Sequence, residues 1–146
     1  MSKEYDPRMH STEHILNQTM VRMFNRGRSF SNHIEKKKSK CDYHFDRDLT
    51  PKEISEIENR VNIEIKKNQN VSEEFLPREI AEREYFLGRL PSDAGDKIRI
   101  IKIGDYDACP CSGIHVKNTS EISEFKIIST GYNNRVLRIR FKLIDN

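Results

Sequence analysis

The chain has 146 residues and a mass of 17.2 kDa, which suits one domain and is too small for a synthetase, a kinase or another large catalytic assembly. Only 35% of the residues are apolar and 34% are charged, so the hydrophobic core must be lean. The net charge of +3 is too small to identify a polyanionic partner by itself. We therefore expect a single domain over residues 1–146.

The sequence shows no recognisable secretory signal or membrane span and contains few cysteines, which predicts a cytoplasmic protein. Residues 1–10 contain no apolar run typical of a secretory signal, and no stretch approaches the roughly 20 apolar residues of a membrane span. Cys41, Cys109 and Cys111 are too few for a disulfide framework, so reduced thiols are available as metal ligands or nucleophiles. The sequence implies no protein partner.

The N-terminal third of the chain shows a helical pattern and then a strand pattern. Apolar residues recur at helical spacing over residues 10–26, and Gly27 follows as a stop. Residues 28–40 hold four lysines and little apolar periodicity, which favours an exposed loop or hairpin. Alternation over residues 41–45 then predicts a short strand.

The central part of the chain contains the best specified helix. It begins at residues 50–53, where Thr50 and Glu53 form a capping box around a proline at the first helical position. Its apolar face comprises Ile54, Ile57, Val61 and Ile65. Residues 71–75 are expected to be extended, and Pro77 begins another helical stretch that carries Ile80, Ala81 and Leu87.

From Lys97 onward the pattern is that of strands, over residues 98–104, 124–130 and 135–143. Residues 131–134 are expected to form a hairpin turn. In the last strand Leu137, Ile139, Phe141 and Leu143 face one way, and Arg138, Arg140 and Lys142 face the other. The predicted fold class is α+β, with helices packed on one side of a largely antiparallel sheet.

Two pairs of residues have the spacing of metal ligands. His10 and His14 are one helical turn apart, and Cys111 and His115 form a second pair in a loop between predicted strands. One thiolate and three imidazoles make a tetrahedral set suited to Zn²⁺. The pairs are far apart in the chain, so the fold must assemble this site, which is typical of a metal in a working cleft, with a buried structural site as the alternative.

Residues 10–14 also match the H-x-x-E-H pattern of inverted zinc peptidases, in which a glutamate beside a metal histidine is the general base. Those enzymes use a carboxylate third ligand and a larger scaffold. We therefore keep a metallopeptidase as a minor alternative. Glu13 is a candidate catalytic base, and a solvated helix residue is the more common role of such a glutamate.

Three segments together carry a family resemblance: HSTEHIL at 10–16, LTPKEISEIENRVNIEIKKNQNV at 49–71 and CSGIHVKNTSEISEFKI at 111–127. In this order they resemble the zinc-dependent editing domain of alanyl-tRNA synthetases, in its freestanding AlaX form. Related domains of threonyl-tRNA synthetases share the metal motifs. The resemblance implies the two-layer sandwich common to both synthetases, and one zinc ion held by His10, His14, Cys111 and His115.

The activity that the resemblance implies is hydrolysis, in trans, of the ester that joins a wrong amino acid to alanine tRNA. Serine is the expected amino acid and glycine the second. The partner is then the acceptor end of mischarged tRNA. Editing of threonine tRNA, or a non-catalytic zinc module that binds tRNA, are the alternatives.

The chain also departs from the family pattern around the second metal pair. Ser112 and Ile114 replace a glycine and a threonine, and Cys109 occupies a position that is usually acidic. Lys126 matches a lysine of the family and is a candidate catalytic residue, although a lone lysine on a strand is more often solvated or directed to phosphate. Thr12 is a candidate contact for a serine hydroxyl, with an ordinary surface threonine as the alternative.

Basic residues are concentrated in two places. The first includes Lys36, Lys37 and Lys38, and the second is the terminal strand with Arg138 and Arg140. Both are candidate contacts for the phosphates of a tRNA acceptor stem, with solubilising surface charge as the alternative.

Overall fold

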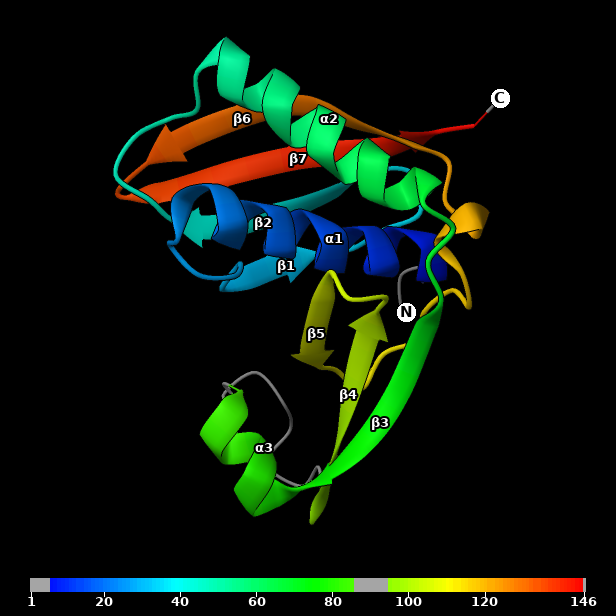
Figure 1. Ribbon diagram of the computed structural model, residues 1–146. Coiled ribbons are helices and arrows are strands. Elements are labelled where there is room, and N and C mark those ends of the chain that lie inside the picture. The colour runs from blue at the N-terminus through cyan, green and yellow to red at the C-terminus, as the bar shows by residue number, and fades with distance from the viewer. Residues whose placement is uncertain (1–5, 86–94, 146) are drawn as a thin grey trace, which may run out of the picture.

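The computed structural model describes residues 6–85 and 95–145 and contains two antiparallel sheets and three α-helices (Figure 1). The four-stranded sheet has the order β1-β2-β7-β6, and the three-stranded sheet has the order β3-β4-β5. The strands are β1 (Ser31–His33), β2 (Ser39–His44), β3 (Val71–Pro77), β4 (Lys97–Ile103), β5 (Asp107–Pro110), β6 (Glu124–Asn133) and β7 (Val136–Ile144).

The helices α1 (Pro7–Phe24) and α2 (Pro51–Lys66) lie across one face of the four-stranded sheet, and α1 also borders the smaller sheet (Figure 1). The short helix α3 (Arg78–Glu84) packs on β3 and β4, and a 3-10 turn, η1 (Thr119–Glu121), precedes β6. The predicted α+β class with antiparallel pairing is confirmed. None of the described helices is both long and apolar enough to cross a membrane.

The strands divide into two sheets rather than one. The predicted strand at 98–104 is β4, and it pairs with β3 and with β5, a strand that the sequence analysis did not identify. Ile98 and Ile100 of β4 pack with Ala81 of α3 in a small second core. Because β4 has hydrogen-bonding neighbours on both sides, it is not available to pair with β6 or β7.

Helix α1 begins earlier than the apolar pattern indicated. Asp6 is its N-cap, with its carboxylate accepting the Arg8 amide at 2.9 Å, and Pro7 takes the first helical position. The helix ends at Phe24 because Asn25 adopts a left-handed conformation, so the stop lies two residues before Gly27.

Helix α2 begins as predicted. The Thr50 hydroxyl accepts the Glu53 amide at 3.1 Å, and the Glu53 carboxylate accepts the Thr50 amide at 2.9 Å. Ile57, Val61 and Ile65 are buried as predicted, and the main core also includes the 1% exposed Phe125 and the fully buried residues Leu137, Ile139 and Phe141.

The hairpin between β6 and β7 turns later than expected. The strands continue to Asn133 and resume at Val136, so only Asn134 and Arg135 form the turn, both with positive φ. A two-residue turn of this conformation matches the twist of antiparallel strands. The other assignments hold: residues 28–40 include the β1–β2 hairpin, and α3 carries Ala81, whereas Leu87 lies outside the described residues.

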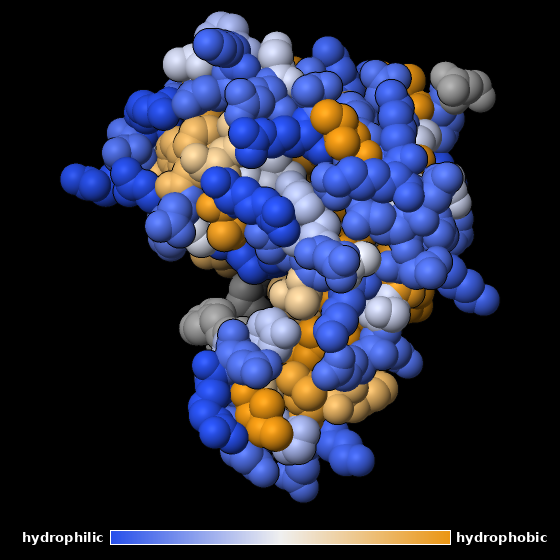
Figure 2. Space-filling view, in the orientation of Figure 1, coloured by the Kyte–Doolittle hydropathy of each residue, from blue (hydrophilic) through white to orange (hydrophobic). Residues whose placement is uncertain are grey.

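The surface reflects the lean core. In the space-filling view most residues over α1 and α2 are hydrophilic, and hydrophobic residues are visible chiefly between the helices and over the smaller sheet (Figure 2). The face seen in this view is therefore mostly hydrophilic.

The capping box of α2 gives a pH-dependent contribution to stability. Hydrogen bonds from Arg47 and the Thr50 amide lower the pKa of Glu53 from 4.5 to about 2. A carboxyl group whose pKa is lowered in the folded state stabilises the fold fully when the pH is above its ordinary pKa. This contribution is lost as the pH falls through the lowered pKa of about 2. We expect Glu53→Gln to cost about 1 kcal/mol at pH 7. In thermal unfolding, the difference from the unchanged protein should shrink between pH 4.5 and 2.

The matched control is Glu56→Gln, one turn along the same helix. Glu56 forms an exposed ion pair with Arg60, so its replacement should cost less. Equal losses for the two variants at pH 7, or a difference that persists at pH 2, would contradict this account of the cap.

Candidate metal centre

Helix α1 and the loop after β5 bring four potential metal ligands together. The ligand atoms of His10, His14, Cys111 and His115 all lie within 4.8 Å of one another. The two histidines of α1 are one turn apart, and β4 fixes the loop, since Arg99 donates to the Cys111 and Gly113 carbonyls at 3.2 and 2.6 Å. The structure thus brings together the four residues that the sequence analysis selected.

The imidazoles of His10 and His115 are stacked and both direct Nε2 toward the Cys111 sulfur. The Nε2 atoms of His10 and His115 lie 3.4 and 3.5 Å from Cys111 Sγ. The opposite ring atoms point away from the centre: His10 Nδ1 lies 3.3 Å from the Ile114 carbonyl, and His115 Nδ1 lies 3.0 Å from the Ser11 hydroxyl. Such outer contacts hold a histidine so that its other nitrogen is presented to a metal.

Electrostatics at the centre favour a thiolate. Burial opposes ionisation of Cys111, but hydrogen bonds from His10, His115 and His14 outweigh it and lower the thiol pKa to about 3. For His14, burial favours the neutral ring, but interactions with Asp107, Cys111 and Glu13 raise the pKa to about 9. These two pKa values therefore favour a negative charge on the Cys111 sulfur and a positive charge on the His14 ring.

The donor set fits Zn²⁺. Zinc bonds of about 2.0–2.1 Å to nitrogen and about 2.3 Å to sulfur, in a tetrahedron, place nitrogen and sulfur about 3.6 Å apart. The observed separations of 3.4 and 3.5 Å are close to that value. One thiolate with three imidazoles also matches the borderline softness of the ion.

Glu13 lies at the centre and is buried, so the interpretation as a solvated residue is wrong. Only 4% of Glu13 is exposed, because α1 lies between the larger sheet and β5. Its Oε1 atom is 3.6 Å from His10 Nε2 and 4.0 Å from His14 Nε2. Its Oε2 atom accepts a hydrogen bond from Asn17, which itself accepts the Ser29 amide at 2.9 Å.

A cavity of about 840 Å³ opens beside the four donors. His10, Glu13, His14 and Cys111 line one part of it. The rest includes Arg28 and two aromatic side chains, Phe30 and Tyr85. The volume is in the range of small-molecule sites, and a mixed apolar and polar lining is typical of them.

Two other candidates from the sequence lie near the centre in different roles. Cys109 lines the cavity, and burial raises the pKa of its thiol to about 12, so it is neutral beside the Cys111 thiolate. Thr12 is fully buried, and its hydroxyl donates to the Arg8 carbonyl at 2.7 Å. That bond turns the hydroxyl back along the helix.

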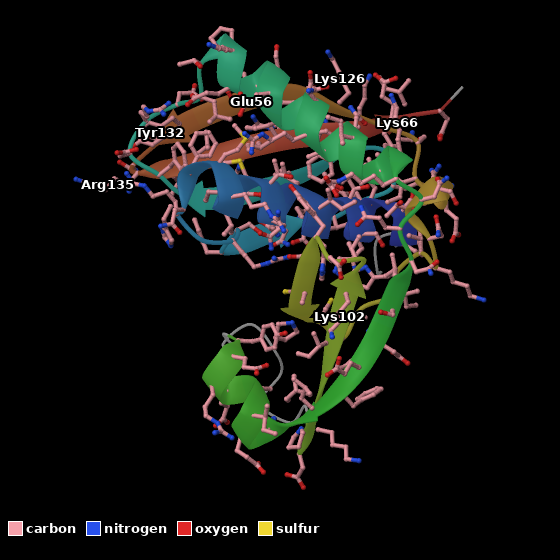
Figure 3. All side chains as sticks on the ribbon, in the orientation of Figure 1. Glu56, Lys66, Lys102, Lys126, Tyr132 and Arg135 are labelled. Atoms are coloured by element: carbon pink, nitrogen blue, oxygen red, sulfur yellow. The ribbon has the colours of Figure 1, made fainter. Side chains whose placement is uncertain are left out.

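The structure places Lys126 away from the four donors. It lies on β6 beside α2, at the top of Figure 3, whereas the donors lie between α1 and the loop after β5. Half of its side chain is exposed, and its Nζ atom is 3.7 Å from Glu58. The expected solvated position is confirmed.

The basic residues lie on the four-stranded sheet and its β1–β2 loop. Lys36, Lys37 and Lys38 are exposed in that loop. On β7, Arg138 donates to both carboxylate oxygens of Asp42, at 2.8 and 3.0 Å, and Arg140 lies 3.5 Å from the Ser129 hydroxyl.

Three polar residues at the centre were missed by the sequence analysis: Asn17, Arg28 and Asp107. Asn17 is one turn beyond Glu13 on α1, so its contact follows helical spacing once Glu13 is known to be buried. Arg28 and Asp107 meet through tertiary structure, and no local spacing links them.

Comparison with known proteins relates the chain to domains of tRNA synthetases. Residues 98–140 match the model of the threonyl and alanyl tRNA synthetase second additional domain. The alanine–tRNA ligase of Methylococcus capsulatus is 30% identical over 128 residues, which is 82% of this chain and 14% of the ligase. The chain is related to the second additional domain of alanyl-tRNA synthetases.

Other alanine–tRNA ligases give the same result. That of Fervidobacterium nodosum is 33% identical over 123 residues, covering 84% of this chain and 14% of the ligase. That of Thermoanaerobacter sp. (strain X514) is 43% identical over 81 residues, which is 56% of this chain and 9% of the ligase. The chain therefore spans only a small part of the length of these relatives. The domain relationship is shared, and the activity of the whole ligase does not follow from it.

Metal analysis tests the centre directly. We expect about one zinc ion per chain, and we expect Cys111→Ala and His14→Ala each to lose most of it, because a three-ligand site binds more weakly. Cys109→Ser is the matched control, since its thiol is neutral and should not be required. Metal retained in both alanine variants, or lost in the control, would show that the ligand set is different.

Proposed function

We propose that this protein is a cytoplasmic, zinc-dependent aminoacyl-tRNA deacylase that acts in trans on mischarged alanine tRNA, with seryl-tRNA as its main substrate and glycyl-tRNA as its second. One observation carries the proposal: a centre of three Nε2 atoms and one thiolate lies beside a buried carboxylate and a cavity. The relationship to alanine–tRNA ligases supports the choice of tRNA. Residues 1–146 would act as one editing domain.

Glu13 is suited to activate the water that attacks the ester. Its Oε1 atom faces the metal-binding nitrogens of both helical histidines, and Asn17 holds the other oxygen. In the proposed reaction the Glu13 carboxylate takes a proton from water as the oxygen attacks the ester carbonyl. The proton then passes to the departing ribose oxygen, which leaves a free amino acid and tRNA with its terminal hydroxyl restored.

The other groups of the centre bind the metal ion or exclude bulk water, and they do not transfer protons. When bound, zinc supplies positive charge that stabilises the developing negative charge on the carbonyl oxygen. His10, His14, Cys111 and His115 would occupy four positions around the ion, so the water is held mainly by Glu13. The partly enclosed cavity removes bulk water, which strengthens these electrostatic interactions.

The open face of the four-stranded sheet is suited to hold RNA. Its register places Lys40 directly opposite Arg140, and Lys126 opposite Lys142. Like charges opposite one another destabilise a sheet. Asp42 and Glu58 balance part of this charge through their ion pairs with Arg138 and Lys126, and a polyanion on this face would balance the rest. The exposed Lys36–Lys38 loop extends the same charge beyond Lys40.

A panel of charged tRNAs tests the proposed activity. Serine, glycine, alanine and threonine are each attached to alanine and threonine tRNAs, and release of the amino acid is followed under single-turnover conditions. We expect serine to be released fastest from alanine tRNA, alanine to be retained, and a chelator to abolish release. Release of amino acid from threonine tRNA alone would show that the substrate is mischarged threonine tRNA and not alanine tRNA.

Glu13→Gln provides the matched inactive variant. It should retain zinc and slow release by about 10²- to 10⁴-fold, because a general base has been removed, whereas Glu56→Gln on α2 should be unaffected. If the protein without substitutions binds charged tRNA but releases no amino acid, the result would instead support a non-catalytic zinc module. Cleavage of peptides would support the metallopeptidase.

The salt dependence of tRNA binding tests the basic face. Replacing Lys36, Lys37 and Lys38 by glutamine should reduce the slope of log affinity against log salt by about 2 to 3, since fewer counterions are released. Zinc content should not change. Lys52→Gln/Lys66→Gln, on α2 and on the covered side of the sheet, is the control. An unchanged slope for the loop variant would make this loop ordinary solvated surface.

A further inference from the structure

A buried carboxylate stands behind His14, on the side away from the other three donors. Asp107 Oδ2 lies 3.6 Å from His14 Nδ1, and the Asp107 side chain has no exposed area. The Nδ1 atom is itself buried and has no hydrogen-bond partner at normal distance among the described residues. The Asp107 carboxylate therefore faces a buried nitrogen that needs an acceptor.

Three donors from two segments fix the Asp107 carboxylate. Arg28 donates to Oδ1 at 2.6 Å and to Oδ2 at 3.2 Å, and Gln18 donates to Oδ1 at 2.8 Å. A bidentate guanidinium contact holds a carboxylate in one plane. Since Gln18 is one turn after His14 on α1, the same helix that carries the imidazole also aligns the group behind it.

The histidines differ in what holds them. His10 and His115 face a neutral carbonyl and a neutral hydroxyl, whereas His14 faces a carboxylate. A carboxylate on the outer nitrogen makes an imidazole a stronger metal ligand than a neutral acceptor does, because it stabilises the proton on that nitrogen. His14 is also the most buried of the three, so it has the least access to water as an alternative partner.

We propose that Asp107, fixed by Arg28 and Gln18, is the positioning residue that holds His14 with Nε2 directed to the metal. The proposal rests on the proposed zinc centre and adds a residue to it. In this arrangement His14 Nδ1 keeps its proton and donates it to Asp107 Oδ2 while Nε2 binds the ion. Asp107 touches neither the ion nor the substrate.

Zinc affinity, measured by competition with a chelator, tests the proposal. We expect Asp107→Asn to weaken zinc binding by about 10- to 100-fold, because the amide is a poorer acceptor and releases Arg28. The matched control is Asp105→Asn, an exposed aspartate two residues earlier, which should bind zinc as the unchanged protein does. Absence of zinc binding by the unchanged protein would refute the metal centre itself, whereas equal affinity in Asp107→Asn and the unchanged protein would refute only the role of Asp107.

A spectroscopic signature separates positioning from a merely structural role. In the Co²⁺-substituted protein, the His14 Nδ1 proton should give a shifted signal that exchanges slowly with solvent, and this exchange should accelerate in Asp107→Asn. If Asp107→Asn does not fold, the double variant Asp107→Asn/Arg28→Gln removes the unpaired guanidinium. We expect that variant to fold and still to bind zinc weakly; full recovery of affinity would show that Asp107 only neutralises Arg28.

Discussion

The structure depends on burying a helix that carries polar groups on the side that faces the site. Helix α1 lies between the larger sheet and β5, so its side chains have little access to water (Figure 1). A buried polar group without a partner costs about 1–3 kcal/mol. Several of these groups therefore pair with another segment: Ser11 with His115 and the Val116 amide, Asn17 with the Ser29 amide, and Thr19 with Tyr106.

Charge balance links the centre to the rest of the fold. The Cys111 thiolate, Glu13 and Asp107 bring negative charge to one buried region, and Arg28 and His14 compensate part of it. Burial of unpaired charge is expensive, so the remaining negative charge would favour a cation in this region. Zinc at this place would remove the proton that His14 otherwise binds, which joins metal affinity to the protonation of the same side chains.

The division into two sheets fixes the position of the loop that carries Cys111 and His115. The smaller sheet has only a minor core of its own, and the side chain of Arg99 on β4 reaches the loop carbonyls. The Val116 amide donates to Ser11 at the far end of the loop, so the loop is anchored to both layers. Loop position, and with it the geometry of the four donors, is thus set by two elements that are distant in sequence.

Elements with local sequence signals could be predicted before the fold was known. The capping box of α2, the alternation on β7 and the pairing of His10 with His14 follow from spacing along one segment, and these features are confirmed in the structure. The choice of Cys111 and His115 as their companions came from ligand chemistry. The tertiary structure alone decided that β4 joins a separate sheet and that Glu13 is buried, because both depend on which segments pack together. It also brought Asp107 and Arg28 close to His14. These three residues come from different segments and meet because of burial and charge, and neither produces a periodic pattern in the sequence.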